Sequence, residues 1–362
     1  RNVIEFSTYD EYTPRAYPLC KEMGFDYLWY RWDHDDEQGS IEGLNELASY
    51  GIKACIIDED FISLMQTEGV TKAQADALTK NYINSAAYWG NWLVDEPNWN
   101  AIHPVGCRCR DCGVNGTRGG NFLRAIQKFE EFYGDKYFQL NLLPIYVWEC
   151  DTDQKLQQAY SNYIDYVDVY AQESGVNLIM QDSYPHGMNG KTGWVATHYL
   201  KGLSVTAEAA RDNNAAHGLY IKTLNEVGMP KITEESIRFE AFSGLAYGTS
   251  KISFFFSTFQ ANGLMTETSK TGTFEYAQEM ISDLHSISDV YSKYDWQAAV
   301  CFRGDGNNAW VNAVAQYGQS EANNRFIRKV LTDVDCNNDV LIGGFNETYG
   351  SGYGFCVVNQ SN

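Results

Sequence analysis

The sequence predicts a (β/α)8 barrel followed by a small antiparallel β-domain. The barrel is predicted because short apolar runs alternate with longer amphipathic stretches, and this alternation repeats eight times before about residue 294. The second part is predicted by a change of pattern, since from residue 295 short β-forming runs are separated by Gly and Asn turns. We therefore divide the chain into residues 1–294 and 295–362.

The predicted barrel strands are near-continuous apolar runs, as expected for parallel strands that are buried on both faces. An open doubly wound sheet is the alternative architecture. It usually has fewer repeats and carries a Gly-rich phosphate loop after its first strand, which this chain lacks. The predicted strands cover residues 2–9, 26–33, 52–60, 88–97, 137–144, 177–185, 217–226 and 251–258.

The predicted helices occupy the stretches between these strands. Gly134 stops an amphipathic helix, and Thr233 can cap another helix whose first turn carries Glu234 and Glu235, where acids suit the helix dipole. Besides the helix capped by Thr233, helices are expected over residues 14–23, 40–50, 71–86, 120–134 (the helix that Gly134 stops), 153–174, 195–213 and 272–292.

Four short strands are expected in the C-terminal part, over residues 296–302, 309–317, 339–346 and 353–360. The last of them ends close to Asn362, which leaves open whether the β-domain is complete in this sequence. At the other end, the chain begins at Arg1 without Met or an apolar leader, so we expect a processed or trimmed chain.

Composition excludes several classes of partner. The formal net charge is -20, and an acidic protein is repelled by nucleic acid and by anionic membrane surfaces. No stretch approaches the roughly 20 consecutive apolar residues that a membrane span requires. Aromatic residues make up 14% of the chain, with 25 Tyr and 9 Trp, which suits both a large core and stacking on sugar rings.

An extracellular location is expected from the cysteines, the sequons and the acidic charge. The chain has 9 Cys, an odd number that still allows disulfides in an oxidising compartment. Sequons at Asn115, Asn346 and Asn359 predict N-glycosylation at these three positions. We therefore expect a secreted glycoprotein.

The C-terminal ends of the predicted strands are acidic and aromatic, and in a barrel this edge carries the active site. The sequence has no nucleophile elbow, HExxH motif or phosphate loop. Paired carboxyl groups with aromatic side chains are instead what glycosidic bond cleavage needs, because one acid protonates the leaving oxygen and the other attacks the anomeric carbon or activates water. The acids at these strand ends are Glu5, Asp33, Asp58, Glu59, Asp60, Asp95, Glu96, Asp182 and Glu226.

Two of these acids carry a resemblance to known enzymes. Glu96 follows the fourth strand and Glu226 follows the seventh, and each precedes a proline, Pro97 or Pro230. This layout resembles the clan of retaining (β/α)8-barrel glycoside hydrolases. The resemblance implies that Glu96 is the acid/base and Glu226 the nucleophile in the cleavage of β-glycosidic bonds.

A cysteine cluster shortly after Glu96 narrows the resemblance from the clan to one family within it. Cys107, Cys109 and Cys112 form a CxCxxC motif, which is similar to the zinc cluster of family 42 β-galactosidases. The resemblance implies a closed structural Zn²⁺ site with Cys55 as the fourth ligand, and His103 or Cys150 as alternatives. Disulfides are the other possibility, with Cys109 or Cys112 paired to Cys150 or Cys20.

One residue departs from the clan pattern. The residue before the acid/base is usually an Asn that contacts the sugar 2-hydroxyl, whereas this chain has Asp95. An ionised Asp accepts hydrogen bonds but cannot donate them. This puts an ordinary galactoside or glucoside in doubt as the substrate, and would suit either a 2-amino sugar or a changed role for Asp95.

Further substrate contacts are expected from the same edge. Asp182 and Tyr184 could orient the sugar or the nucleophile, and Asp182 is the alternative nucleophile in place of Glu226. Arg31 could bind a sugar group or form a structural ion pair with Asp33 or Asp58. Stacking on a sugar is expected of Trp32 and Trp99, whereas Trp89 and Trp92 lie within a strand and are more typical of a core.

The sequence therefore predicts a secreted glycoside hydrolase that acts on an oligosaccharide or polysaccharide and needs no cofactor for catalysis. The alternative is a catalytically inactive barrel that binds glycans or has a structural role outside the cell. An ion pair from Glu226 to Lys222 or Arg31 that closes the barrel mouth would favour this alternative.

Overall fold

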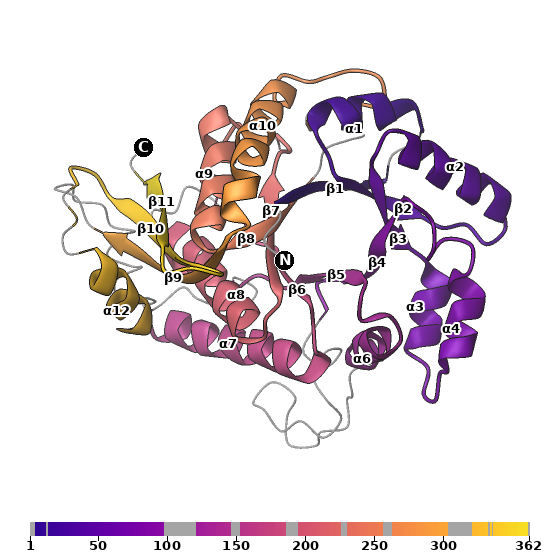
Figure 1. The fold of residues 1–362 in the computed structure, drawn as a ribbon, viewed down its shortest axis with the longest axis horizontal. Coiled ribbons are helices and arrows are strands. Elements are labelled where there is room, and N and C mark those ends of the chain that lie inside the picture. Colours follow the sequence, from indigo (N-terminus) through magenta and orange to yellow (C-terminus); the bar gives the residue numbers. More distant parts are fainter. Residues whose placement is uncertain are drawn as a thin grey trace.

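A computed structural model describes residues 4–11, 14–97, 121–145, 153–185, 195–225, 230–255, 263–302, 321–331, 334 and 336–360. These residues form a closed barrel of parallel strands in the order β1 to β8 and a three-stranded antiparallel sheet in the order β11-β10-β9 (Figure 1). The predicted fold class is confirmed. The strands are β1 (Glu5–Glu11), β2 (Tyr27–Arg31), β3 (Lys53–Ile57), β4 (Tyr88–Asp95), β5 (Tyr137–Leu142), β6 (Leu178–Gln181), β7 (Ala216–Lys222), β8 (Thr249–Phe255), β9 (Tyr294–Phe302), β10 (Val340–Glu347) and β11 (Tyr353–Asn359).

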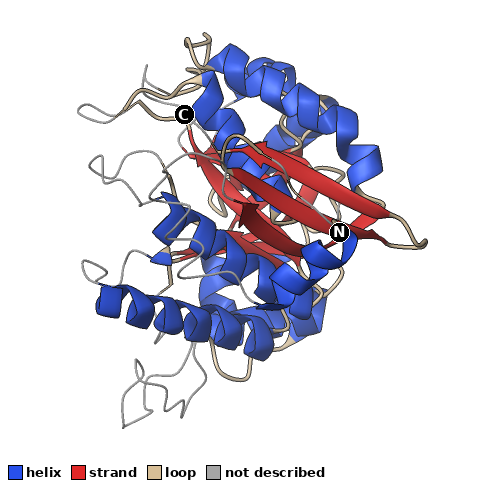
Figure 2. Ribbon diagram, turned by 90° about the vertical axis from the view of Figure 1, so that its left-hand side faces the viewer, coloured by secondary structure: helices blue, strands red, loops and turns tan. Residues whose placement is uncertain are grey.

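Helices surround the strands, as Figure 2 shows from the side. The predicted cap at Thr233 is confirmed, because its side chain accepts a hydrogen bond from the Ser236 N–H. The helical segments are η1 (Pro14–Ala16), α1 (Tyr17–Met23), α2 (Glu37–Ser49), α3 (Glu59–Met65), α4 (Lys72–Thr79), α6 (Asn121–Tyr133), α7 (Asp153–Ser174), the π-helical η3 (Val195–Leu200), α8 (Lys201–Asp212), α9 (Glu234–Ala246), α10 (Phe274–Tyr291) and α12 (Glu321–Val330).

Helix α3 was not predicted, and it changes the role of one of the expected acids at the strand ends. Asp58 is fully buried and caps α3, since its side chain accepts a hydrogen bond from the Phe61 N–H at 2.9 Å. Its other oxygen accepts from the Tyr82 hydroxyl at 2.9 Å. Asp58 therefore positions the start of a helix, which is the usual task of an Asp that precedes a helical turn.

The barrel interior is filled by aromatic side chains. Trp89 is 5% exposed and stacks on Tyr27 and Tyr137, with ring centroids 4.1 and 4.9 Å away. Its indole N–H donates to Glu5, which also forms a 2.7 Å ion pair with Lys251. Glu5 is the first residue of β1, so it lies at the N-terminal end of the barrel, and its expected place among the acids of the opposite end is wrong.

The small sheet shares a hydrophobic core with the barrel. One cluster of buried side chains joins Leu245 of α9 and Ile252 of β8 to Trp296, Phe345 and Val358 of the sheet. Strand β9 begins at Tyr294, beside the predicted domain boundary. The sheet therefore packs on the outside of the barrel helices, as seen at the left of Figure 1.

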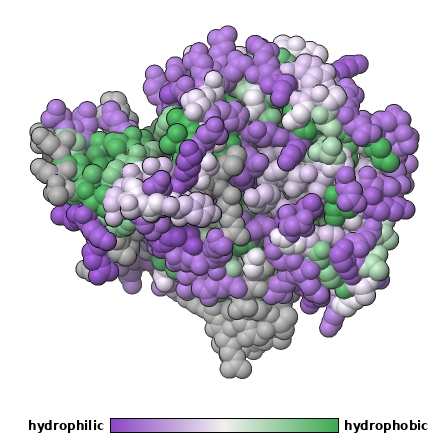
Figure 3. Space-filling model, in the orientation of Figure 1, coloured by the Kyte–Doolittle hydropathy of each residue, from purple (hydrophilic) through white to green (hydrophobic). Residues whose placement is uncertain are grey.

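The sheet also carries the most hydrophobic part of the visible surface. Hydrophobic side chains gather over its β10–β11 end in Figure 3, and Phe355 and Val357 of β11 are 37% and 62% exposed. The expected strand over residues 309–317 lies outside the described residues. Within the described ranges, no helix combines the length and the apolarity needed to cross a membrane.

Candidate active site

Polar side chains from three neighbouring strands meet at the C-terminal end of the barrel. Asn141 of β5 is 1% exposed, and its side-chain NH2 group donates to Asp95 Oδ1 at 2.9 Å and to Asp182 Oδ2 at 2.8 Å. Asp95 ends β4 and Asp182 directly follows β6. Asn141 thus bridges two of the expected site residues at the edge where barrel active sites lie.

Glu96, the expected acid/base, directly follows Asp95 and has an unusual backbone conformation. Its φ angle is 43°, in the left-handed region that non-Gly residues rarely adopt. The Glu96 N–H donates to the Asn141 carbonyl oxygen at 2.8 Å, which holds the turn against β5. Strained backbone of this kind is enriched at functional sites, where the surrounding structure maintains it.

The pKa values of Glu96 and Asp182 are raised. Partial burial, the charge of Asp182 and then that of Asp95 raise the pKa of Glu96 to about 7. Burial raises the pKa of Asp182 to about 6, with a further increase from Asp95 and opposing hydrogen bonds from Tyr184 and Asn141. Near neutral pH, Glu96 can therefore carry a proton and donate it.

Two buried oxygen atoms of the cluster lack a hydrogen-bond partner among the described residues. They are Asn141 Oδ1 and Asp182 Oδ1, and Asp182 is only 9% exposed. Buried polar atoms are nearly always satisfied, so each of these oxygens is suited to accept a hydrogen bond from a ligand or from water.

Two other residues expected to contact the substrate, Tyr184 and Arg31, have different surroundings. Tyr184 stacks on Phe255 at the end of β8, with ring centroids 5.4 Å apart, and forms an aromatic wall near Asp182. Arg31, at the end of β2, forms a 2.6 Å ion pair with Glu59. An ion pair was expected for Arg31, but with Asp33 or Asp58 as the partner.

The placement of Trp32 corrects its expected role. Its side chain is 4% exposed and packs in the core, with its ring 5.0 Å from that of Tyr82. A buried indole leaves no face for a sugar ring. Trp89 is a core residue, as expected, and Trp92 lies 5.2 Å from the ring of Trp29.

Several expected site residues lie outside the described part of the chain. Glu226 follows Asn225, the last described residue after β7, so its predicted role as nucleophile stays a prediction. The same holds for the remaining ones, which are Trp99, Cys107, Cys109, Cys112 and Asn115.

Cys55, the expected fourth zinc ligand, stays a prediction, because Cys107, Cys109 and Cys112 lie outside the described residues. Cys55 is fully buried in the barrel interior, in a cluster with Tyr27, Trp29 and Trp89, and burial raises its thiol pKa well above the usual value. No group of three or more His, Cys, Asp or Glu side chains in the described ranges could hold a metal ion.

Two of the three sequon asparagines are described. Asn359 is exposed at the end of the edge strand β11. Asn346 is half-buried in the central strand β10, where it is paired with Tyr353 and Asp295. Of these two, Asn359 is the more accessible for a glycan.

Asn141 is the residue that sequence reasoning missed. The signal was present, because Gln139 and Asn141 alternate with Phe138 and Leu140 along β5. Polar residues at every second position of a barrel strand point to one face, here the interior. The partners of Asn141 come from β4 and β6, so only the closed barrel identifies them.

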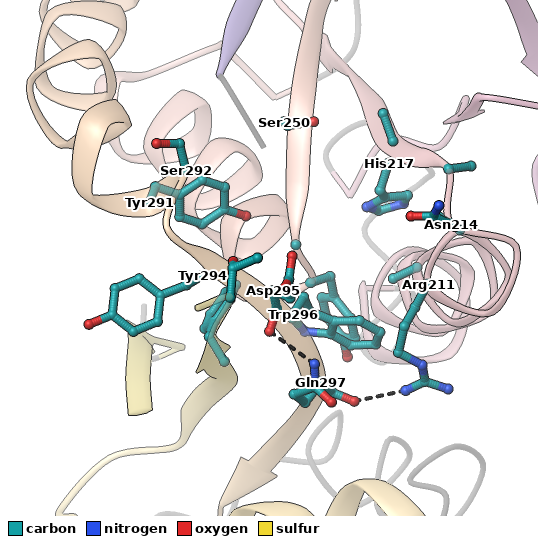
Figure 4. A pocket seen from close by; sticks show the side chains of 18 of the residues that line it. Arg211, Asn214, His217, Ser250, Tyr291, Ser292, Tyr294, Asp295, Trp296 and Gln297 are labelled. Carbon is teal, nitrogen blue, oxygen red and sulfur yellow. Dashed lines mark hydrogen bonds between the residues drawn. The ribbon is translucent and has the colours of Figure 1, made fainter. Parts of the chain in front are cut away.

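A separate cavity of about 410 Å³ lies where β7 and β8 begin, between the barrel and the small sheet (Figure 4). Its polar groups are already paired. Arg211 donates to the Gln297 carbonyl oxygen, and both ring nitrogens of His217 contact threonine hydroxyls at 2.8 and 2.9 Å. Burial lowers the pKa of His217 to about 3, so it is neutral, and we assign no chemistry to this cavity.

Comparison with known proteins supports the fold. No family model matches the chain, and no match was found among curated proteins. Among solved structures, a candidate α-L-fucosidase from Bacteroides thetaiotaomicron is similar, with 10% identity over 79% of this chain and 95% of that chain and a TM-score of 0.50.

Two further similar structures have lower TM-scores. A GH5_18 protein from Bifidobacterium longum subsp. infantis has 11% identity over 78% of this chain and 79% of its own, with a TM-score of 0.47. An intracellular xylanase from Thermoanaerobacterium saccharolyticum has 10% identity over 78% and 96%, with a TM-score of 0.45. The similarity to the α-L-fucosidase structure, at 10% identity, supports the fold alone, and the argument for function has to come from the site.

Proposed function

We propose that the protein is a glycoside hydrolase that cleaves β-glycosidic bonds, with Glu96 as the proton donor. The observation that carries this proposal is the setting of Glu96. Its pKa is raised to about 7 by burial and by the neighbouring charges of Asp182 and Asp95, and it stands at the C-terminal end of β4. A carboxylic acid that stays protonated beside ionised carboxylates is what the leaving oxygen of a glycoside requires.

In the retaining mechanism that we propose, the Glu226 carboxylate attacks the anomeric carbon and the glycosidic C–O bond breaks. The leaving oxygen takes the proton of Glu96. In the second step Glu96, now a carboxylate, removes a proton from water, and the water oxygen displaces Glu226 from the anomeric carbon. Asp182 is the alternative nucleophile, because it already belongs to the described cluster.

The ion-pair partner of Arg31 is relevant to the alternative that the barrel is catalytically inactive. An ion pair from Arg31 to Glu226 across the mouth would favour that alternative. The structure pairs Arg31 with Glu59 of the adjacent helix α3, and the Arg31 side chain is about half exposed. Glu226 lies outside the described residues, so the structure does not test an ion pair between Arg31 and Glu226.

The test of the proposed function is hydrolysis of a panel of aryl β-glycosides, followed by NMR of the first-formed product. Turnover with the β-anomer released first supports the retaining pair. If the α-anomer is released first, the enzyme inverts the anomeric configuration and the retaining mechanism is wrong. Absence of turnover on the panel and on β-linked oligosaccharides would contradict the hydrolase and favour a glycan-binding barrel.

The rise in the Glu96 pKa predicts a pH dependence. Protonated Glu96 is the active form, so kcat/KM should fall as the pH rises through about 7. The negative charge of Asp182 opposes ionisation of Glu96, so Asp182→Asn should lower the Glu96 pKa and move this alkaline limb to lower pH. The measurement is kcat/KM against pH. An alkaline limb unmoved in Asp182→Asn, or moved equally in the control Asp60→Asn, would refute the coupling.

We further propose that the protein is secreted and glycosylated, which the sequons and the exposed position of Asn359 support. A structural zinc at Cys107, Cys109 and Cys112 remains a prediction, with Cys55 as the expected fourth ligand and His103 or Cys150 as alternatives. Disulfide bonding of these cysteines is the alternative. No catalytic step depends on the outcome.

A further inference from the structure

Apart from the proton of Glu96, the described side chains of the acid cluster are mainly hydrogen-bond acceptors for a ligand. The side-chain NH2 group of Asn141 has two N–H bonds, and these already serve Asp95 and Asp182. Among the described residues, Asn141 Oδ1 and Asp182 Oδ1 are buried acceptors without a partner, and the Ser183 hydroxyl next to Asp182 also has none. A ligand group that enters here must therefore bring several donors.

The cluster also has an excess of negative charge. The three carboxyl groups are close enough that the charge of Asp182 and then that of Asp95 raise the pKa of Glu96, and the charge of Asp95 raises the pKa of Asp182. Neither Glu96 nor Asp182 forms an ion pair with a described residue. A cation placed among these carboxyl groups would offset their repulsion and would form charge-assisted hydrogen bonds, which are stronger than neutral ones.

Three groups that can occupy carbon 2 of a sugar differ in how well their hydrogen-bond donors and charge match this cluster. A hydroxyl brings one donor and no charge. An acetamido group brings one N–H, but also a carbonyl oxygen that needs a donor, and both N–H bonds of Asn141 are already used. An ammonium group brings three donors and a positive charge, which matches the acceptors and the charge of the cluster.

We propose that the sugar bound against this cluster is an unacetylated 2-amino sugar, whose ammonium group lies among Asp95, Asp182 and Asn141 Oδ1. The assignment to carbon 2 rests on the proposed function. If Glu96 protonates the glycosidic oxygen on the anomeric carbon, we place the substituent of the adjoining carbon 2 against Asp95 and Asp182, whose charges act on Glu96. The substrate is then a cationic oligosaccharide or polysaccharide, which also suits a chain of net charge -20.

The experiment measures binding without turnover. Phenyl 1-thio-β-glycosides of glucosamine, N-acetylglucosamine and glucose, whose sulfur linkage resists hydrolysis, are titrated into the wild-type protein by calorimetry at about pH 7, where an amine is largely protonated. We expect the glucosaminide to bind at least tenfold more tightly than the other two. Equal or tighter binding of the glucoside or the N-acetylglucosaminide overturns the proposal.

Variants separate the local site from the overall charge. Asp182→Asn and Asp95→Asn should each reduce the preference for the glucosaminide about tenfold. The control Glu59→Gln removes the same unit of charge from an exposed acid at the end of β3 and should leave the preference unchanged. A loss in Glu59→Gln equal to that in Asp182→Asn would assign the preference to net charge and refute the site. Circular dichroism checks the fold of each variant.

The two proposals fail in different ways. Tight glucosaminide binding with no hydrolysis of any β-glycoside would contradict the hydrolase and support the amino-sugar site. Rapid hydrolysis of glucosides or N-acetylglucosaminides, with the glucosaminide bound no better than these, would support the hydrolase and overturn the amino-sugar site.

Discussion

Replacement of Glu96 with Gln is expected to lower kcat/KM by about 10²- to 10⁴-fold on glycosides with a poor leaving group, the range typical of a lost general acid. Gln keeps the size of the side chain but has no acidic proton. The loss should shrink on 2,4-dinitrophenyl glycosides, because that leaving group departs without protonation. The measurement is kcat/KM for wild type and variant across aryl glycosides of increasing leaving-group acidity.

Glu59→Gln is the matched control for this experiment. Glu59 is an exposed acid at the same end of the barrel, and it contacts Arg31 instead of the cluster. Its replacement should change kcat/KM by less than threefold on every substrate. An equal loss in Glu96→Gln for good and poor leaving groups would show that Glu96 acts by another route than protonation of the leaving oxygen.

Replacement of Trp89 with Ala is expected to lower the free energy of unfolding by about 3–5 kcal/mol, the usual cost of truncating a large buried aromatic side chain. Trp89 is 5% exposed, stacks on two tyrosine rings and donates a hydrogen bond to Glu5. Its removal leaves a cavity inside the barrel, where the closed ring of strands limits collapse, and removes the donor to Glu5.

Urea unfolding followed by circular dichroism measures this change. Tyr349→Ala is the control, because Tyr349 is fully exposed in the turn after β10 and its loss should change the free energy of unfolding by less than about 0.5 kcal/mol. A loss below about 1 kcal/mol in Trp89→Ala would contradict the tight interior packing. The variant also separates stability from chemistry, since Trp89 lies in β4 well before the acids at its end.

The fold could be predicted from the sequence because the patterns that indicate its strands and helices are local. Parallel strands buried on both faces must be apolar along their whole length, so each barrel strand was recognisable alone. The cap at Thr233 and the stop at Gly134 likewise depend on neighbouring residues. Helix α3 was missed because it is short, and its Asp58 cap had been assigned to the active-site edge.

A site residue could be predicted when its position at the end of a strand was sufficient to place it at the active-site edge of the barrel. Asp95, Glu96 and Asp182 follow apolar runs, and a barrel brings such strand ends to one edge. Arg31 was expected there too, but its choice of Glu59 depends on the course of α3. Trp32 was expected to stack on a sugar and is instead a core residue, because a residue after a strand can turn toward the helices.

The sequence by itself determined the fold class, the order of the strands and the acids that end strands four and six, since periodicity and strand length are properties of contiguous residues. Only the tertiary structure decided how those acids interact. Asn141 lies 46 and 41 residues from the two aspartates that it bridges. The same closure placed Cys55 among aromatic rings and Glu5 beside Lys251. Hydrogen bonds, burial and shared charge act through space, and closure of the barrel decides which distant residues share that space.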